Sequence, residues 1–373
     1  MPTITEVPES RLPAGVQRLP RPAALGRAVE LAFLRWEKRR LAPTESFWRD
    51  FGFHIVDSSA ERLVARGTGS SPCIAIATRG DADRFVGPAF VMSEDTDLGR
   101  YVQTMGARWL APAELPAGGR GVELNDPSGR PVWLLQDQHA AAALRVRQPL
   151  VADTNTPVHA PRVNRSVRMP IEPAQVVRLG HVVFQTVDFP HMIDWYQRML
   201  GIIPTDVQYL ADGSPTLAFC RLNLGAQPAD HHTVVIVGAI EEKYEHSAYE
   251  VIDLDALGQG QQVLRAQGHK HMWGIGRHLI GSQLFDYWFD PEGFEYEHYT
   301  DGDLFTAEFE TAYSPLTFGG LWAWGEDAPA SMKPKKNLRN LLRIAGLLRR
   351  KAITPARLKL LGQALDAPAR PWS

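Results

Sequence analysis

Residues 121–135 read GVELNDPSGRPVWLL, and residues 285–297 read FDYWFDPEGFEYE. Each stretch is predicted to form a strand, a turn of the form Asp-Pro-x-Gly, and a second strand. Proline presets φ in such a turn and glycine accepts a positive φ, so residues 126–129 and 290–293 are predicted turns on physical grounds. Two copies of one hairpin in a single chain indicate an internal repeat.

The sequence before each hairpin repeats one order of elements. The expected elements are a strand at 29–34, helices at 44–53 and 95–105 with short strands between them, then a strand at 179–186 and helices at 189–200 and 255–267, again with strands between. Glycines at 52, 106, 201 and 268 are placed to end the helices. We therefore predict an α+β fold with two tandem βαβββ-repeat modules.

The composition of the linking segments sets the domain boundaries. The predicted domains are an N-terminal arm (1–25), a first βαβββ-type module without metal (26–140), a linker (141–175), a second, metal-binding βαβββ-type module (176–312) and a C-terminal extension (313–373). The arm is rich in Pro and Arg, and the linker is rich first in Ala and then in Pro, Asn and Arg, which is typical of connecting segments.

The overall composition excludes several classes of protein. The chain has 373 residues, a net charge of -2 and two cysteines, Cys73 and Cys220. This charge indicates no polyanionic partner, so no nucleic acid is expected. Two cysteines imply no disulfide framework and fit a reducing cytoplasm. The N-terminus lacks the pattern of a signal peptide, and no uncharged run reaches the ~18 residues of a membrane span. We expect a soluble, cytoplasmic protein.

Three stretches of the second module carry histidine or glutamate on predicted strands. They are GHVVFQT (180–186), EHSAYEV (245–251) and FEYEHY (294–299). His181, His246 and Glu297 would form a facial set of two imidazoles and one carboxylate with open positions, which suits non-heme Fe(II) and O2. Taken singly, each residue reads more readily as a core histidine or a solvated strand glutamate.

The first module has no counterparts of these three residues. The positions that fall opposite His181, His246 and Glu297 are about Ala32, residues 87–89 and Trp133, respectively. The first module is therefore expected to keep the fold and to lack the metal.

Over roughly residues 28–310, the chain resembles the type I extradiol ring-cleavage dioxygenases of the vicinal oxygen chelate superfamily. The family signature is a glycine two residues before a histidine, then a tyrosine, Asp-Pro-x-Gly and the liganding glutamate. The matching residues are Gly276, His278, Tyr287, the turn at 290–293 and Glu297. Asp286 departs from the family, which usually has an apolar residue before the tyrosine.

The resemblance implies a role for each candidate residue. His181, His246 and Glu297 are the expected metal ligands. His232, or its neighbour His231, matches the acid/base histidine near the oxygen position, and a histidine suits that role because its pKa lies near working pH. The alternative is a His-His pair that merely precedes a strand.

Two further residues match substrate-binding groups of the family. His278 is expected to hydrogen-bond the substrate or the oxygen intermediate. Tyr287 is expected to orient a substrate hydroxyl and to help its deprotonation, with a core aromatic as the alternative reading. His298 is expected to face away from the metal, because side chains alternate along a strand.

The resemblance implies a function in the degradation of aromatic compounds. The expected reaction is cleavage of a catechol-type diol beside its hydroxyls by an Fe(II)-dependent dioxygenase that inserts both atoms of O2. Fe(II) is expected in preference to Mn(II), although the ligand types do not determine the metal uniquely. The alternatives are another metalloenzyme of the superfamily, either a hydroquinone dioxygenase or a glyoxalase-like isomerase, and a non-catalytic small-molecule binding protein.

The C-terminal extension lies outside the resemblance. Residues 333–351 hold eight Lys/Arg and no acid, with leucines at helical spacing, which predicts a basic amphipathic helix. We expect it to dock on the body or on a second subunit, with a membrane-surface or polyanion contact as the alternative. Edge strands and this helix are compatible with a homo-oligomer. The sequence leaves open which aromatic diol is cleaved.

Overall fold

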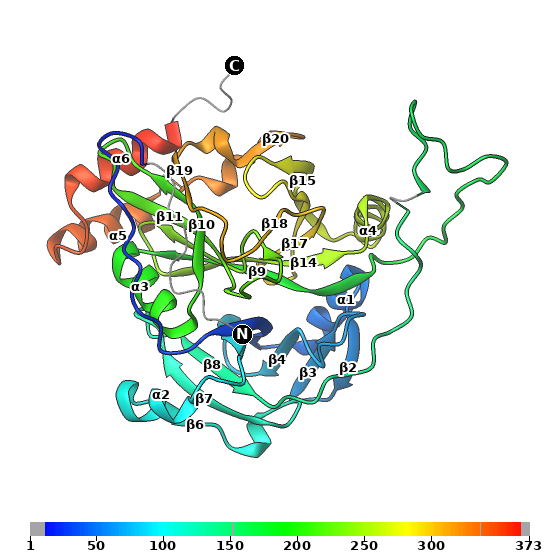
Figure 1. Cartoon of the computed structure of the whole chain (residues 1–373), viewed down its shortest axis with the longest axis horizontal. Helices are drawn as coiled ribbons and strands as arrows, with labels where there is room; N and C mark the ends of the chain where they lie inside the picture. Colours follow the sequence, from blue (N-terminus) through cyan, green and yellow to red (C-terminus); the bar gives the residue numbers. More distant parts are fainter. Residues whose placement is uncertain (1–11, 151–152, 336, 367–373) are drawn as a thin grey trace.

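Two large mixed sheets, one from each half of the sequence, dominate the computed structural model (Figure 1). The structure describes residues 12–150, 153–335 and 337–366, so the first eleven residues of the predicted N-terminal arm lie outside the described residues. The predicted α+β class with tandem modules is confirmed.

The first sheet has eight strands in the order β2-β3-β4-β1-β5-β8-β7-β6. Its elements are β1 (Ala28–Lys38), α1 (Leu41–Phe51), β2 (His54–Ser58), β3 (Arg62–Arg66), β4 (Ala75–Arg79), β5 (Arg84–Met92), α2 (Leu98–Met105), β6 (Arg108–Trp109), η1 (Pro112–Glu114), β7 (Arg120–Asn125) and β8 (Pro131–Gln136). The predicted Asp-Pro-Ser-Gly turn joins β7 to β8, and Gly129 has a φ of 83° there.

The second sheet has ten strands in the order β19-β10-β11-β13-β9-β14-β17-β16-β15-β20. Its elements and the small β12–β18 pair are β9 (Val176–Thr186), α3 (Phe189–Leu200), β10 (Ile203–Tyr209), β11 (Pro215–Arg221), β12 (Ala229–Asp230), β13 (Val234–Gly238), β14 (Lys243–Val251), α4 (Leu254–Ala266), β15 (Lys270–His278), β16 (Leu284–Phe289), β17 (Glu295–Thr300), β18 (Leu304–Phe305), β19 (Ala312–Pro315) and β20 (Trp322–Trp324).

The two sheets repeat one topology strand for strand. The central eight strands of the second sheet, from β10 to β15, follow the order of the first sheet when β9 is matched to β1. The register agrees as well, because Ala89 pairs with Trp133 in the first sheet and Ala248 pairs with Glu297 in the second. The internal repeat seen in the sequence is therefore a structural repeat.

An aromatic and ionic interface joins the two modules. The Trp36 ring of β1 stacks on the Tyr296 ring of β17 at a centroid distance of 5.7 Å, and the Trp48 indole donates a hydrogen bond of 3.2 Å to the Tyr296 hydroxyl. Lys38 is fully buried and its Nζ lies 2.5 Å from an Asp290 carboxylate oxygen. The predicted second turn is thus held by a strand of the first module.

Helix α2 begins three residues later than predicted. Asp97 takes the N-cap position, where its side chain accepts a hydrogen bond from the Gly99 N–H, and the helix starts at Leu98. An aspartate favours this position because its carboxylate satisfies a backbone donor that has no partner in the helix.

The C-terminal extension contains two helices where the sequence predicted one. Helix α5 (Leu338–Arg349) ends at a turn in which Lys351 has a φ of 57°, and α6 (Pro355–Asp366) follows. Proline at the first position of α6 suits a helix start, a signal that the prediction did not use. Figure 1 shows both helices beside the second sheet, on the side of α3, β10 and β11. Among the described residues, no helix has the length and apolar character needed to span a membrane.

Candidate metal centre

Three adjacent strands of the second sheet bring the predicted ligands together. His181 lies on β9, His246 on β14 and Glu297 on β17. In the sheet register His181 and Glu297 both pair with Ala248, from opposite sides. The small methyl side chain of Ala248, two residues beyond His246 and on the same face, leaves space between the three polar side chains. Their potential ligand atoms all lie within 4.8 Å of one another.

The close approach of His181 to its neighbours depends on the glycine before it. A Cβ at Gly180 would lie 2.1 Å from the Tyr299 hydroxyl oxygen, so a larger residue could not be accommodated without moving that ring. The Tyr299 ring packs beside the His181 imidazole at a centroid distance of 5.4 Å. Gly180 therefore leaves room for the Tyr299 ring beside His181.

The geometry around Glu297 fits a divalent cation. The Glu297 Oε2 atom lies 3.1 Å from His181 Nε2 and 3.4 Å from His246 Nε2. Neither Glu297 oxygen has a hydrogen-bond partner among the described residues, although the side chain is fully buried. Two ligands at right angles, each about 2.1 Å from a cation, lie about 3 Å apart, so these contacts match ligands that share one ion.

Burial and mutual contacts set the charge of this group. Burial raises the pKa of Glu297, but the neighbouring imidazoles of His181, His246 and His278 outweigh it and hold the pKa well below its usual value. Burial lowers the pKa of His181. An ionised Glu297 and a neutral His181 are the protonation states in which these two side chains can bind a metal ion.

Two further predicted residues lie beside this group. Tyr287 on β16 and His278 on β15 are linked by a hydrogen bond of 2.9 Å between the Tyr287 hydroxyl and His278 Nε2. His278 Nδ1 lies 2.7 Å from the Leu321 carbonyl oxygen, which can only accept, so Nδ1 is the donor there. His278 Nε2 then accepts a hydrogen bond from the Tyr287 hydroxyl. The lone pairs of the tyrosine oxygen remain free to accept a hydrogen bond from a molecule in the cavity.

His232 belongs to a short chain of polar groups. Its Nδ1 atom lies 2.9 Å from His231 Nδ1, and His231 Nε2 lies 2.8 Å from an Asp206 carboxylate oxygen. The carboxylate can only accept, so His231 Nε2 donates to it, and a neutral His231 accepts at Nδ1. His232 Nδ1 is then the donor, and its Nε2 atom carries a lone pair.

The structure separates the two neighbouring histidines by position. His232 lines the same cavity as His181 and His246, and the centroids of the His232 and His181 rings lie 4.2 Å apart. His231 is buried behind it, between His232 and Asp206. Burial, together with His181 and His231, holds the pKa of His232 well below its ordinary value, so its imidazole is a neutral base. Asp206 was not among the predicted site residues, because its contact with His231 comes from a separate strand.

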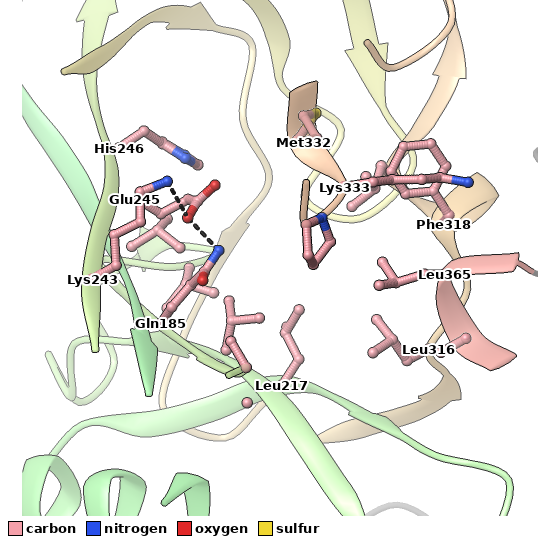
Figure 2. A pocket seen from close by; sticks show the side chains of 18 of the residues that line it. Gln185, Leu217, Lys243, Glu245, His246, Leu316, Phe318, Met332, Lys333 and Leu365 are labelled. Atoms are coloured by element: carbon pink, nitrogen blue, oxygen red, sulfur yellow. Dashed lines mark hydrogen bonds and ion pairs between the residues drawn. The ribbon is translucent and has the colours of Figure 1, made fainter. Parts of the chain in front are cut away.

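One cavity of about 530 Å³ is lined by five of the six predicted site residues. His181, His232, His246, His278 and Tyr287 all line it. Figure 2 shows His246 on one wall, beside a hydrogen-bonded group formed by Gln185, Glu245 and Lys243.

Other histidines of the second module lie outside this cavity. His298 is fully buried, its Nε2 lies 2.7 Å from the Phe51 carbonyl oxygen, and it faces the first module as strand alternation predicts. His271 contacts Asp286, the residue that departs from the family pattern, at 2.8 Å. Asp286 also accepts hydrogen bonds from Gln261 and Trp288, so this buried carboxylate ties α4 to the sheet.

Comparison with known proteins agrees with this fold. The family model of the Glyoxalase/Bleomycin resistance protein/Dioxygenase superfamily matches residues 178–297, a range that includes all three metal candidates. The match lies within the second module, and the expected resemblance to this superfamily is confirmed there.

The particular relatives include ring-cleaving enzymes. Metapyrocatechase 2 from Cupriavidus necator is 30% identical to this chain over 164 residues, which are 44% of this chain and 49% of that protein. The match thus spans about half the length of the curated relative.

Solved structures share the architecture over most of the chain. Homoprotocatechuate 2,3-dioxygenase from B. fuscum superposes with a TM-score of 0.68 at 18% identity, covering 87% of each chain. The Mn(II)-bound glyoxalase from Novosphingobium aromaticivorans superposes with a TM-score of 0.66 at 19% identity, covering 84% of this chain and 96% of that chain. At these identities the likeness shows the fold alone.

Proposed function

We propose that this protein is an extradiol dioxygenase that cleaves a catechol-type aromatic diol with O2 at an Fe(II) site held by His181, His246 and Glu297. One observation carries the proposal: His181 and His246, whose ligand atoms lie within 4.8 Å of each other and of a Glu297 oxygen, line one cavity together with His232, His278 and Tyr287. The metal ligands alone would suit several reactions. The added acid/base groups suit a reaction that removes protons from a diol and returns one later.

Fe(II) bound by these residues would supply a Lewis acid with open positions for both the diol and O2. Mn(II) suits the same ligands, and the metal of this chain is part of the proposal. The single carboxylate leaves the centre with net positive charge, which favours binding of an ionised diol.

Tyr287 and His278 receive the proton of one substrate hydroxyl in this proposal. Burial and the nearby Glu297 hold the pKa of Tyr287 well above its ordinary value, so its hydroxyl stays protonated. A substrate hydroxyl donates to the tyrosine oxygen while the tyrosine donates to His278 Nε2. The Leu321 carbonyl fixes the His278 ring in the orientation that accepts this proton.

His232 serves as the second acid/base group. Its neutral imidazole holds an Nε2 lone pair, so it takes a proton from the diol and later returns it on the oxygen side of the site. The balanced outcome is a ring-opened product that contains both atoms of O2. An isomerase of the same superfamily has no need of a histidine on the O2 side of the site, which favours the dioxygenase proposal.

We also propose a cytoplasmic location. Cys73 and Cys220 are both buried and unpaired, which is consistent with a reducing compartment.

The experiment is anaerobic purification, measurement of bound metal, loading with Fe(II), and addition of a panel of catechols in aerated buffer. We expect about one iron per chain and a yellow ring-opened product formed with equimolar O2 consumption. Failure of the Fe(II)-loaded protein to consume O2 with every diol would contradict the proposal, and product formed without O2 would indicate an isomerase.

A further inference from the structure

The cavity is larger than a single aromatic ring requires. Its volume is about 530 Å³, whereas an apolar cavity of about 150 Å³ is enough to bind benzene. The residues that line it continue from the metal candidates to the C-terminal extension. A diol ring at His181 and His246 would therefore leave most of this space for a substituent.

Apolar side chains form much of the outer cavity. Leu217, Val235 and Val237 contribute from β11 and β13, and Leu316, Phe318, Met332, Leu361 and Leu365 contribute from the C-terminal extension. Figure 2 shows the labelled side chains of the extension across the cavity from His246 and Lys243. A substituent that fills this region must be mainly apolar, because polar groups there would lose water without replacement partners.

The extension is anchored where it borders the cavity. The Arg357 guanidinium of α6 donates hydrogen bonds of 2.7 Å to Ser214 and 2.6 Å to Thr216. The Arg343 guanidinium of α5 lies 2.8 Å from the Glu241 carboxylate. These contacts hold both helices on the second module, and the two helices therefore form one wall of the cavity.

The outer end of the cavity carries excess positive charge. Lys243 pairs with Glu245, and Arg343 pairs with Glu241. The remaining cationic lining residues are Lys333, Lys335 and Arg339. Among the described residues no carboxylate forms an ion pair with any of these three, and the Lys333 ammonium lies over the Phe318 ring at 4.5 Å. This arrangement favours a negative group at the same end.

We propose that the substrate is an aromatic diol with a long apolar substituent that ends in a carboxylate or another anionic group. The ring binds at the metal candidates, the chain lies along Leu217 and Phe318, and the anion reaches Lys333, Lys335 and Arg339. This inference rests on the proposed dioxygenase function and adds the substrate class. It also gives the C-terminal extension a role in selecting the substrate.

The test compares four diols that differ in one feature at a time. They are catechol, a long-chain alkylcatechol, the same compound with a terminal carboxylate, and the same compound with a terminal amide. Anaerobic calorimetry gives Kd for each with the metal-loaded protein, and O2 uptake gives kcat/KM. We expect Kd to fall by up to about fourfold for each methylene that is buried, and to fall further for the carboxylate than for the amide.

A charge-removing variant tests the outer end. The triple variant Lys333→Met, Lys335→Met and Arg339→Met keeps apolar bulk and removes three charges. We expect it to reduce the preference for carboxylate over amide by about tenfold, from a few-fold contribution of each partly exposed cation. The control is Arg349→Met, an exposed residue of α5 outside the cavity lining, which should keep the wild-type preference.

The outcomes separate this inference from the proposed function. If catechol is bound and cleaved but neither the chain nor the carboxylate lowers Kd, the substrate class is wrong and the dioxygenase proposal stands. An unchanged carboxylate preference in the triple variant also overturns the inference. If no diol binds or consumes O2, the dioxygenase proposal itself fails.

Discussion

His231 and His232 are hydrogen-bonded to each other through their Nδ1 atoms at 2.9 Å, so two consecutive residues form one polar unit. Asp206, whose side chain is 19% exposed, ends this unit at 2.8 Å from His231. The carboxylate fixes which nitrogen of each ring holds a proton. Reactivity at His232 in the cavity therefore depends on a residue that does not line it.

Asp206→Asn is expected to weaken that control. An amide can donate to His231 as well as accept from it, so both tautomers of His232 become available. We expect kcat to fall by about 10- to 100-fold with unchanged metal content. Nitrogen NMR of the metal-free protein should show the change of tautomer at His232. Asp212→Asn, on an exposed turn, is the control, and a wild-type kcat in Asp206→Asn would show that the contact is only structural.

His246→Ala should abolish metal binding. The variant removes one of three protein ligands from a group whose other members remain buried. We expect elemental analysis after Fe(II) loading to find almost no bound metal, and we expect turnover to be lost. His269→Ala is the matched control, because His269 contacts Asp50 away from the cavity. Stoichiometric metal in His246→Ala would remove it from the ligand set.

Metal should stabilise the folded protein. No donor among the described residues hydrogen-bonds the buried Glu297 carboxylate, so a cation there would bind the native state and not the unfolded chain. We expect Fe(II) or Mn(II) at about one hundred times Kd to add about 2.7 kcal/mol to the free energy of unfolding. Thermal unfolding with and without a chelator measures this. Equal Tm values under both conditions would contradict a site at Glu297.

Tyr287→Phe should impair catalysis while preserving the fold. The ring packs on Trp273 at a centroid distance of 5.6 Å, and phenylalanine keeps that contact. Loss of the hydroxyl removes the donor to His278 and the contact with a substrate hydroxyl. We expect kcat to fall by about 10- to 100-fold with little change in metal content. Tyr313→Phe serves as the control for loss of a tyrosine hydroxyl elsewhere.

Lys38→Met should destabilise the whole protein. Lys38 is fully buried between Asp290 and Glu292, at 2.5 Å and 2.9 Å. Removing one member of a buried ionic group leaves carboxylates without compensation, which costs about 3–5 kcal/mol. Urea unfolding measures the loss, and Asp290→Asn in the same chain should recover part of it. No recovery in the double variant would show that lost packing, and not charge, causes the defect.

The repeat and the convergence of three polar residues were predictable from local signals. The Asp-Pro-x-Gly turns at 126–129 and 290–293 have the same place in each module, and alternation along β17 correctly places Glu297 and His298 on opposite faces. Assignment of metal to His181, His246 and Glu297 stays a prediction. These features depend on residues close in sequence or on the repeat itself.

The outer cavity and the support of His232 were not predictable in the same way. Leu365 reaches a cavity whose opposite wall includes His246, a residue more than one hundred positions earlier in the chain. Asp206 of β10 meets His231 in the loop between β12 and β13. Such contacts arise from the packing of whole elements, and no spacing pattern along one segment encodes them.

The hydrogen bond from His298 to the Phe51 carbonyl gives the first module a structural role in supporting the metal candidates of the second module. His298 directly follows Glu297 on β17, so its hydrogen bond to Phe51 connects the strand that carries the carboxylate to the first module. The first module has Phe33, Gly87 and Trp133 at the positions where the second module has His181, His246 and Glu297. Expression of the second module alone would therefore expose the Tyr296 ring to solvent and remove Lys38, the ion-pair partner of Asp290. We therefore expect the two modules to fold as a pair, and substitutions near Phe51 to alter the position of Glu297.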